Sequence, residues 1–294
     1  MRPSFEIIPP LKGMSRDELL ESVKPLVELD PSCINVTRHR EEYEFIPSGD
    51  GSFKRVPVRP RMSQEEVCRA VSEEFKVEVV PHLICAGSSR EEVRRELESY
   101  LGMGVRGILA LRGDCLLGEK RFTPAPDGFS YASEMVAAIR SLPDSKGLGI
   151  AVGGYPEKHF EAPNLETDIL NLKRKVDAGA DCVITQMFFD NAVFYDFVGR
   201  CREAGITVPI VPGLKPLSSL KQISMLPESF SIDIPEELCS RVRAAGDSAE
   251  EVYRIGTQWT ISQCRDLIAH GFGRIHFYTM GRTRNITEIV RECF

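Results

Sequence analysis

Glu6 is a carboxylate in an unexpected place. It lies inside the apolar segment SFEIIPP, between Phe5 and Ile7. A carboxyl group that is buried in a strand has a raised pKa and stays protonated near neutral pH, which suits a general acid. The alternative is a carboxylate at the exposed end of that strand. The residue type and its place therefore indicate a candidate proton donor.

The tripeptide Arg112-Gly113-Asp114 follows a second apolar segment, GILAL. A glycine lets the backbone approach a planar or phosphorylated ligand closely. Arginine offers a fork of hydrogen-bond donors, and aspartate offers an acceptor or a charge. We therefore expect a ligand site here rather than an adhesion motif, which needs the exposed loop of a secreted protein.

Other apolar segments also end in polar residues. A single polar residue at such a place is weak evidence, because a helix cap or a solvated end explains it equally well. The whole set is informative if the fold brings its members to one face. These residues are Thr37, His39, His82, Tyr155, Gln186, Lys215, Tyr278 and Arg282.

The elements that position these residues alternate between short β-branched segments and amphipathic helical segments. Ser15 and Ser63 precede two of the helical segments, each with a nearby Glu, as in a capping box. Strands that alternate with helices predict a parallel sheet with right-handed crossovers. Eight such units predict a closed (β/α)8 TIM barrel, with an open doubly wound sheet as the alternative. The expected strands are 4–10, 33–39, 77–85, 107–114, 147–156, 182–190, 208–216 and 274–280.

Two excursions interrupt this rhythm. Residues 40–61 alternate around Ser-Gly-Asp-Gly, which predicts a β-hairpin inserted after strand 2. Extra helical residues, which include the single tryptophan, Trp259, precede strand 8. We expect one catalytic barrel domain over residues 1–294, without a separate regulatory domain.

The predicted helix 164–179 carries two adjacent stripes. At 100° per residue its apolar residues form one stripe that faces the barrel. A polar stripe lies beside it, either as a solvated flank or as a shelf that holds the sugar and phosphates of a nucleotide cofactor. The apolar stripe is Leu165, Ile169, Leu172 and Val176, and the polar one is Asp168, Asn171 and Lys175 with Arg174 beside it.

Composition narrows the class of protein. With 42% hydrophobic and 27% charged residues, the chain is typical of a globular protein. A net charge of −6 argues against nonspecific nucleic-acid binding. We find no apolar run of ~18 residues and no signal peptide, and we expect a cytoplasmic protein without a membrane partner. The nine cysteines include no CxxC pair, so we expect reduced thiols. His82 and Cys85 are three apart on a strand and face opposite sides, and no second His/Cys pair lies nearby, so we expect no metal site.

Ten short segments occur in the order typical of one family. The sequence resembles the bacterial-type methylenetetrahydrofolate reductases over nearly its whole length. This resemblance implies a (β/α)8 barrel that binds FAD, commonly in a homo-oligomer. It implies that NADH or NADPH reduces 5,10-methylenetetrahydrofolate to 5-methyltetrahydrofolate by ping-pong hydride transfer through the flavin. The segments are FEIIPP, NVT, PHLIC, LRGD, YAS, YPEKH, DILNLKRKVDAGAD, ITQMFFD, VPGLKP and HFYTMGR.

The same resemblance implies roles for individual residues. Glu6 matches the general acid that helps to open the imidazolidine ring of the folate, and Asp114 matches a residue that contacts the pterin and tunes the flavin. Residues that match FAD contacts are Thr37, His82, Arg112, Gly113, Asp114, Tyr131, Ala132, Tyr155, His159, Ala162, Asp168, Asn171, Arg174 and Lys175. Residues that match substrate contacts are Gln186, Gln222, Tyr278 and Arg282.

The sequence departs from the family pattern in two places. The insertion 40–61 directly follows the Thr37 segment, and Leu226 stands where some relatives carry an aromatic residue over the nicotinamide or the folate tail. Two other classes of protein remain open at this point. One is another flavin-dependent barrel oxidoreductase, such as a relative of proline dehydrogenase, and the other is a nonenzymatic binding protein built on a barrel.

Overall fold

The apolar segments of the sequence form a parallel β-barrel. In this computed structural model, residues 2–10, 14–38, 42–49, 51–58, 62–113 and 122–294 are described. Within them, eight parallel strands close in the order β1-β10-β9-β8-β7-β6-β5-β2, which confirms the TIM barrel and excludes an open sheet. The strands are β1 (Ser4–Ile7), β2 (Cys33–Val36), β5 (Val79–Ile84), β6 (Gly107–Leu111), β7 (Gly149–Gly154), β8 (Cys182–Met187), β9 (Ile210–Leu214) and β10 (His276–Tyr278).

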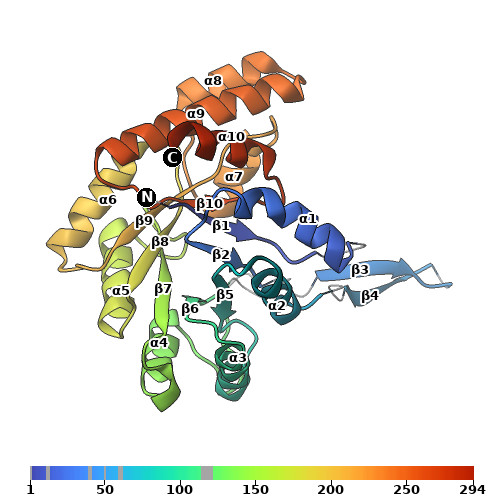
Figure 1. Cartoon of the computed structure of the whole chain (residues 1–294), viewed down its shortest axis with the longest axis vertical. Coiled ribbons are helices and arrows are strands. Elements are labelled where there is room, and N and C mark those ends of the chain that lie inside the picture. The colour runs from blue at the N-terminus through green and yellow to red at the C-terminus, as the bar shows by residue number, and fades with distance from the viewer. Residues whose placement is uncertain (1, 11–13, 39–41, 50, 59–61, 114–121) are drawn as a thin grey trace.

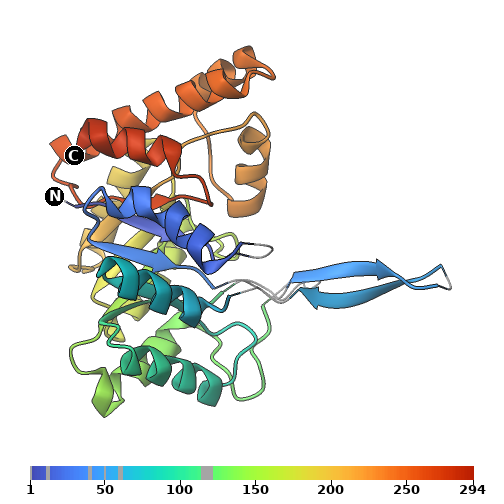
Figure 2. The same ribbon diagram turned by 45° about the vertical axis from the view of Figure 1, so that its right-hand side comes forward.

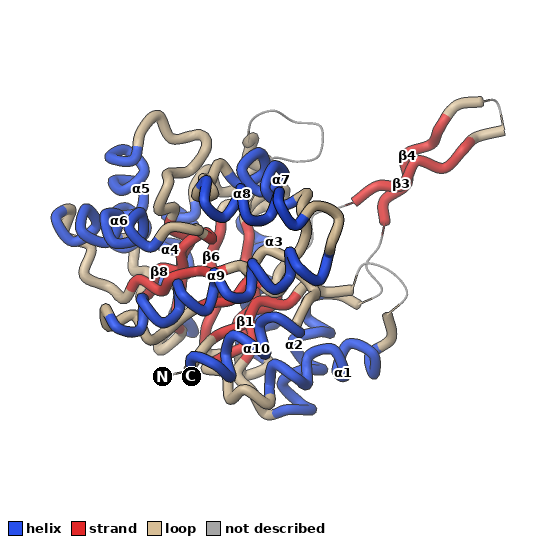
Figure 3. Tube along the Cα trace, turned by 90° about the horizontal axis from the view of Figure 1, so that it is seen from above, coloured by secondary structure: helices blue, strands red, loops and turns tan. Residues whose placement is uncertain are grey.

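Helices surround the strands (Figure 1; Figure 3, from above). Ser15, Ser63 and Ser89 begin three of them, each in a complete capping box with a Glu three residues later. Within the described ranges, no helix combines the length and the hydropathy that a membrane span requires. The helices are α1 (Arg16–Val27), α2 (Gln64–Phe75), α3 (Arg90–Gly102), α4 (Ala132–Arg140), a short 3₁₀ helix (Pro143–Ser145), α5 (Leu165–Asp177), α6 (Asn191–Glu203), α7 (Gln222–Phe230), α8 (Glu236–Ala245), α9 (Ala249–Ala269) and α10 (Arg284–Cys293).

The core has an outer and an inner part. The main apolar cluster lies between the strands and the helices. Since successive strand residues point to opposite faces, the alternate residues fill the barrel itself. Leu109, Ile184 and Val211 form a separate small cluster there. This apolar floor leaves the carboxyl ends of the strands free for polar side chains.

Both predicted insertions are present. Strands β3 (Glu42–Pro47) and β4 (Phe53–Val58) pair in an antiparallel two-stranded sheet. Figure 2 shows this hairpin extending away from the barrel. Of the predicted insertion 40–61, residues 40, 41, 50 and 59–61 lie outside the described residues. Helices α7, α8 and α9 stand between β9 and β10, as expected for the extra helices before the last strand.

Candidate active site

A cleft lies at the carboxyl ends of the barrel strands. It consists of a larger cavity of about 620 Å³ and a smaller one of about 340 Å³. The two are continuous, because Leu111, Arg112, Gly153, Tyr155 and His159 line both. The cleft is therefore elongated, with two arms that meet at the end of β6.

The two arms bring together most of the predicted residues. The larger cavity is lined by Glu6, Thr37, His82, Arg112, Gly113, Tyr155, His159, Gln186 and Tyr278. The smaller cavity is lined by Arg112, Tyr131, Ala132, Tyr155, His159, Ala162, Asp168, Asn171, Arg174 and Lys175.

The smaller cavity is bordered by the polar stripe of α5. Its apolar neighbours Ile169 and Leu172 are buried in the main core, which turns the polar stripe toward the cavity. Burial raises the pKa of Asp168, although its carboxylate accepts a hydrogen bond from the His159 backbone N–H at 3.0 Å. Nζ of Lys175 donates to the Gly153 carbonyl at 2.5 Å, and burial lowers the pKa of Lys175 to about 8. An acidic and a basic side chain thus both line this cavity, with Asp168 buried and Lys175 half-buried.

Arg112 stands where the two arms meet. Its guanidinium forms an ion pair with Glu161 at 2.5 Å and lies over the Phe122 ring, 4.6 Å from the centroid. Gly113 has φ +84°, and a Cβ there would lie 2.8 Å from the Cβ of Ala86. The glycine is therefore required by its positive φ and by its close packing against Ala86. The sequence alone had suggested a close approach to a ligand instead. Asp114 lies outside the described residues.

Glu6 lies at the inner wall of the larger cavity. Its strand neighbour Phe5 is fully buried against the helices, so alternation turns Glu6 into the barrel. The residue is 7% exposed, and burial raises the pKa of its carboxyl to about 8, with Lys215 acting in the opposite direction. The carboxyl is therefore mainly protonated at neutral pH.

His82 faces Glu6 across the cavity wall. Its Nε2 lies 3.7 Å from Oε2 of Glu6 and has no hydrogen-bond partner within the part of the chain that the structure describes. Burial lowers the pKa of His82 to about 3. The ring is neutral at physiological pH, so the two side chains form a pair of neutral groups rather than an ion pair.

The strand ends are tied together by side-chain hydrogen bonds. Tyr278 Oη donates to the Thr185 carbonyl at 2.7 Å, and Thr279 Oγ1 donates to the Glu6 carbonyl at 2.6 Å. The register between β8 and β9 shifts next to Gln186. Such irregularities re-aim side chains near active sites.

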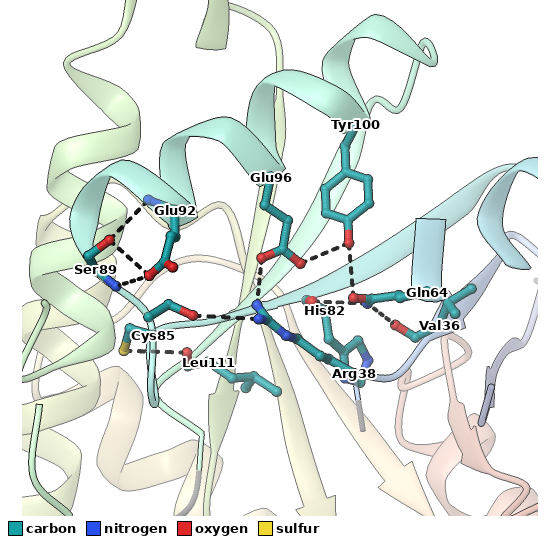
Figure 4. Close-up of polar contacts among 11 residues, drawn as sticks. Val36, Arg38, Gln64, His82, Cys85, Ser89, Glu92, Glu96, Tyr100 and Leu111 are labelled. Carbon is teal, nitrogen blue, oxygen red and sulfur yellow. Dashed lines mark hydrogen bonds and ion pairs between the residues drawn. The ribbon is translucent and has the colours of Figure 1, made fainter. Parts of the chain in front are cut away.

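A second network supports β2 and β5 from outside (Figure 4). Gln64 Nε2 donates to the carbonyls of Val36 and His82 at 2.7 and 2.9 Å. Tyr100 Oη donates to Gln64 Oε1 at 2.9 Å.

Arg38, which lines the larger cavity, pairs with Glu96 at 2.5 Å. Sequence reasoning missed Arg38 and Gln64. Arg38 stands directly after Thr37, where a strand end at the mouth was expected.

Two predicted substrate residues, Gln222 and Arg282, are not among the residues that line the two cavities. Gln222 Oε1 accepts a hydrogen bond from the Ser218 backbone N–H at 2.7 Å. Nη1 of Arg282 donates to the Ser218 hydroxyl at 3.0 Å. Both residues therefore hold the loop between β9 and α7.

The larger cavity also has an apolar rim that the sequence did not predict. Phe160, Phe230 and Met280 are among its lining residues. Leu226, one helical turn before Phe230, is fully buried in a satellite core and does not line the cavity. Phe230 thus presents an aromatic surface at this side of the cleft. Phe160 could have been proposed from the sequence, because an aromatic residue directly follows the YPEKH segment.

Comparisons with known sequences agree on one family. A family model described as methylenetetrahydrofolate reductase matches residues 1–293. The chain is 34% identical to methylenetetrahydrofolate reductase (NADH) 1 of Arabidopsis thaliana, covering 98% of this chain but 47% of the relative. It is 33% identical to 5,10-methylenetetrahydrofolate reductase of Salmonella typhimurium, covering 95% and 86%. The chain thus spans about half the length of the plant relative and most of the bacterial one.

A solved structure supports the fold. It is that of an uncharacterized protein from Clostridium thermocellum that binds two copies of 5-methyl-5,6,7,8-tetrahydrofolic acid. The TM-score is 0.63 at 15% identity, and the match covers 99% of this chain and 93% of the other. Given the family model and the relatives above, this chain belongs to the methylenetetrahydrofolate reductase family.

Proposed function

We propose that this protein is an FAD-dependent enzyme that reduces 5,10-methylenetetrahydrofolate to 5-methyltetrahydrofolate with NAD(P)H. Family membership supports the reaction. The observation that carries the proposal from the structure is a buried carboxyl at the wall of the larger cavity, Glu6, whose pKa burial raises to about 8. The name of the plant relative supports NADH as the donor, and NADPH is the alternative.

The cleft fits a dinucleotide such as FAD. The smaller arm has cations from Arg112, Arg174 and Lys175 for phosphates and the Asp168 carboxyl for a ribose hydroxyl. At the larger arm, the unpartnered Nε2 of His82 is a buried polar atom without a bond in the described residues, as expected for a ligand contact. A bound FAD would supply the redox chemistry between the nicotinamide and the folate.

Glu6 would act on the folate substrate. Its proton goes to N10 of the imidazolidine ring, and the bond between N10 and the bridging methylene breaks with its electrons on nitrogen. This opens the ring to the reactive iminium. A positively charged His82 would lower the pKa of the Glu6 carboxyl. Because His82 is neutral, Glu6 keeps its proton until the folate arrives.

Tyr278 and Gln186 would position the pterin, because both line the larger cavity beside Glu6. Asp114 is proposed to contact the pterin and tune the flavin, on the family pattern alone. Gln222 and Arg282 are proposed to serve the substrate by holding the Ser218 loop at the rim. A homo-oligomer is also part of this proposal, and light scattering on the purified protein tests it.

Anaerobic flavin spectroscopy tests the proposed function. The purified protein, supplied with FAD, should show a flavin absorbance spectrum. NADH should bleach it, and methylenetetrahydrofolate should restore it. A protein that binds no FAD contradicts the proposal. A flavin that NADH bleaches but folate never restores would point to a different barrel oxidoreductase.

A further inference from the structure

Lys215 is a buried lysine at the carboxyl end of β9, only 6% exposed. The strand registers place it level with Glu6. Leu214 pairs with Phe277, and Phe277 pairs with Phe5. One residue further along each strand, Lys215 and Glu6 flank Tyr278 at the same height of the barrel.

Lys215 belongs to the inward-facing side of β9. Gly213, two residues earlier, also faces the interior, because a Cβ there would lie 2.7 Å from Cε2 of Tyr278. Residues two apart on a strand share a face. Lys215 therefore projects into the same interior as Tyr278 and Glu6, which lie on the next two strands. The lysine is not among the residues that line the two cavities, so it acts on the Glu6 carboxyl rather than on a bound ligand.

The groups around Glu6 come from four neighbouring elements. Asn35 of β2 is level with it, His82 of β5 is 3.7 Å away, and Tyr278 of β10 is adjacent in register. In the described residues none of these three is a cation at neutral pH. Lys215 is the charged group that acts on the Glu6 carboxyl, and Arg282 in turn acts on Lys215. No ion pair within 4 Å joins Lys215 and Glu6 in the described residues, so the interaction acts through space in a buried setting.

We propose that Lys215 is a positioning residue whose ammonium stabilises the carboxylate that Glu6 becomes once it has protonated the folate. This rests on the proposed function. The O–H bond of Glu6 breaks, the N10–H bond forms, and N10 keeps the electrons of the broken bond to the methylene. The new carboxylate is buried, and the nearby positive charge lowers the free energy of that state. Water reprotonates Glu6 after the product leaves.

The protonation states agree with this role. Burial and the Arg282 charge lower the pKa of Lys215 to about 8, against the effect of Glu6. Below that pH the lysine is charged while Glu6 still carries its proton. The pair thus holds one transferable proton and one fixed positive charge.

Infrared spectroscopy of the oxidised holoenzyme tests the proposal without folate. The carboxylic acid band of Glu6 is identified by its absence in Glu6→Gln, and its loss with rising pH gives the pKa of Glu6. In Lys215→Met this pKa should rise by about one unit or more. In Lys215→Arg it should stay near the wild-type value. Lys146→Met, which removes an exposed lysine before β7, is the matched charge control.

Stopped-flow kinetics give the functional counterpart. Lys215→Met should slow reoxidation of the reduced flavin by methylenetetrahydrofolate about tenfold near neutral pH, and Lys215→Arg should restore most of that rate. FAD content and the rate of reduction by NADH report whether each variant is folded. Lys215→Gln is a second neutral variant in case Lys215→Met does not fold.

An unchanged pKa of Glu6 in both neutral variants would overturn the proposal. So would a Lys215→Arg variant that is as slow as Lys215→Met. The proposed acid role of Glu6 fails separately, if Glu6→Gln reduces folate at the wild-type rate. In that case the infrared titration still decides whether Lys215 controls the Glu6 carboxyl.

Discussion

The carboxyl of Glu6 lies 3.7 Å from Nε2 of His82, and both groups are neutral at physiological pH. Burial produces this state, because it raises the pKa of an acid and lowers that of a base. Glu6 thus stays protonated beside His82, which does not take up its proton.

The folate half-reaction should depend on the protonation of Glu6. The pKa of this carboxyl is about 8, so the group is protonated below that pH and loses its proton as the pH rises through it. Flavin reoxidation by methylenetetrahydrofolate should therefore fall above pH ~8, by about tenfold per unit. Stopped-flow measurements across pH check this. A rate that stays constant well above pH ~8 would speak against Glu6 as the acid.

Burial of His276 should make the protein sensitive to acid. Burial, with His82 adding to it, lowers the pKa of His276 to about 3, and the ring contacts the Ser4 hydroxyl at 2.9 Å. The unfolded chain takes up this proton near pH 6.5 and the folded one does not, so stability is lost as pH falls below ~6.5. In His276→Asn this loss should be shallower, although the variant starts about 1–3 kcal/mol less stable.

Urea unfolding between pH ~4 and ~7 measures the acid sensitivity. His270→Asn is the matched control, because His270 is exposed at the end of α9. Equal slopes for wild type and His276→Asn would refute the prediction.

Lys175→Met should weaken FAD binding. The ammonium of Lys175 lines the smaller cavity beside Asp168, where we propose that it contacts the phosphates. Loss of one charge-assisted contact costs about 1.5–3 kcal/mol, which corresponds to a rise in Kd of about tenfold or more. Fluorescence titration of the apoprotein with FAD measures this. Lys173→Met removes a lysine on the same helix that pairs with Asp177 outside the cavity, and its Kd should match the wild type. Equal Kd values for the two variants would contradict the assignment.

Gly113→Ala should destabilise the end of β6. The residue has φ +84°, and a methyl group there would lie 2.8 Å from the Cβ of Ala86. Gly104 has φ +81° with no atom within 4 Å of an added Cβ, so Gly104→Ala isolates the backbone strain. We expect Gly104→Ala to cost about 1 kcal/mol and Gly113→Ala to cost more, with weaker FAD binding as well. Similar unfolding free energies for the two variants would show that the contact with Ala86 relaxes.

Local patterns in the sequence were sufficient for much of this structure. Capping at Ser15 and Ser63 depends on neighbouring residues, and it was predicted correctly. The polar stripe of α5 was also predicted, because helix periodicity alone separates Asp168 from Ile169.

Relationships between distant strands could not be predicted in the same way. Lys215 and Glu6 lie at the same height of the barrel because of the register of three strands that are far apart in sequence. The aromatic surface at Phe230 depends on how α7 packs: Leu226 is buried in the satellite cluster, and Phe230, one turn later, packs against that cluster and also lines the cavity. Periodicity in one segment does not determine either of them.

Separating the two half-reactions in Glu6→Gln is the decisive measurement of the proposed acid role of Glu6. The variant should bind FAD and be reduced by NADH at a rate close to the wild type. Its reduced flavin should then be reoxidised by methylenetetrahydrofolate at least about a hundredfold more slowly, because no proton reaches N10. Reoxidation at the wild-type rate in this variant would contradict the role of Glu6 as the proton donor.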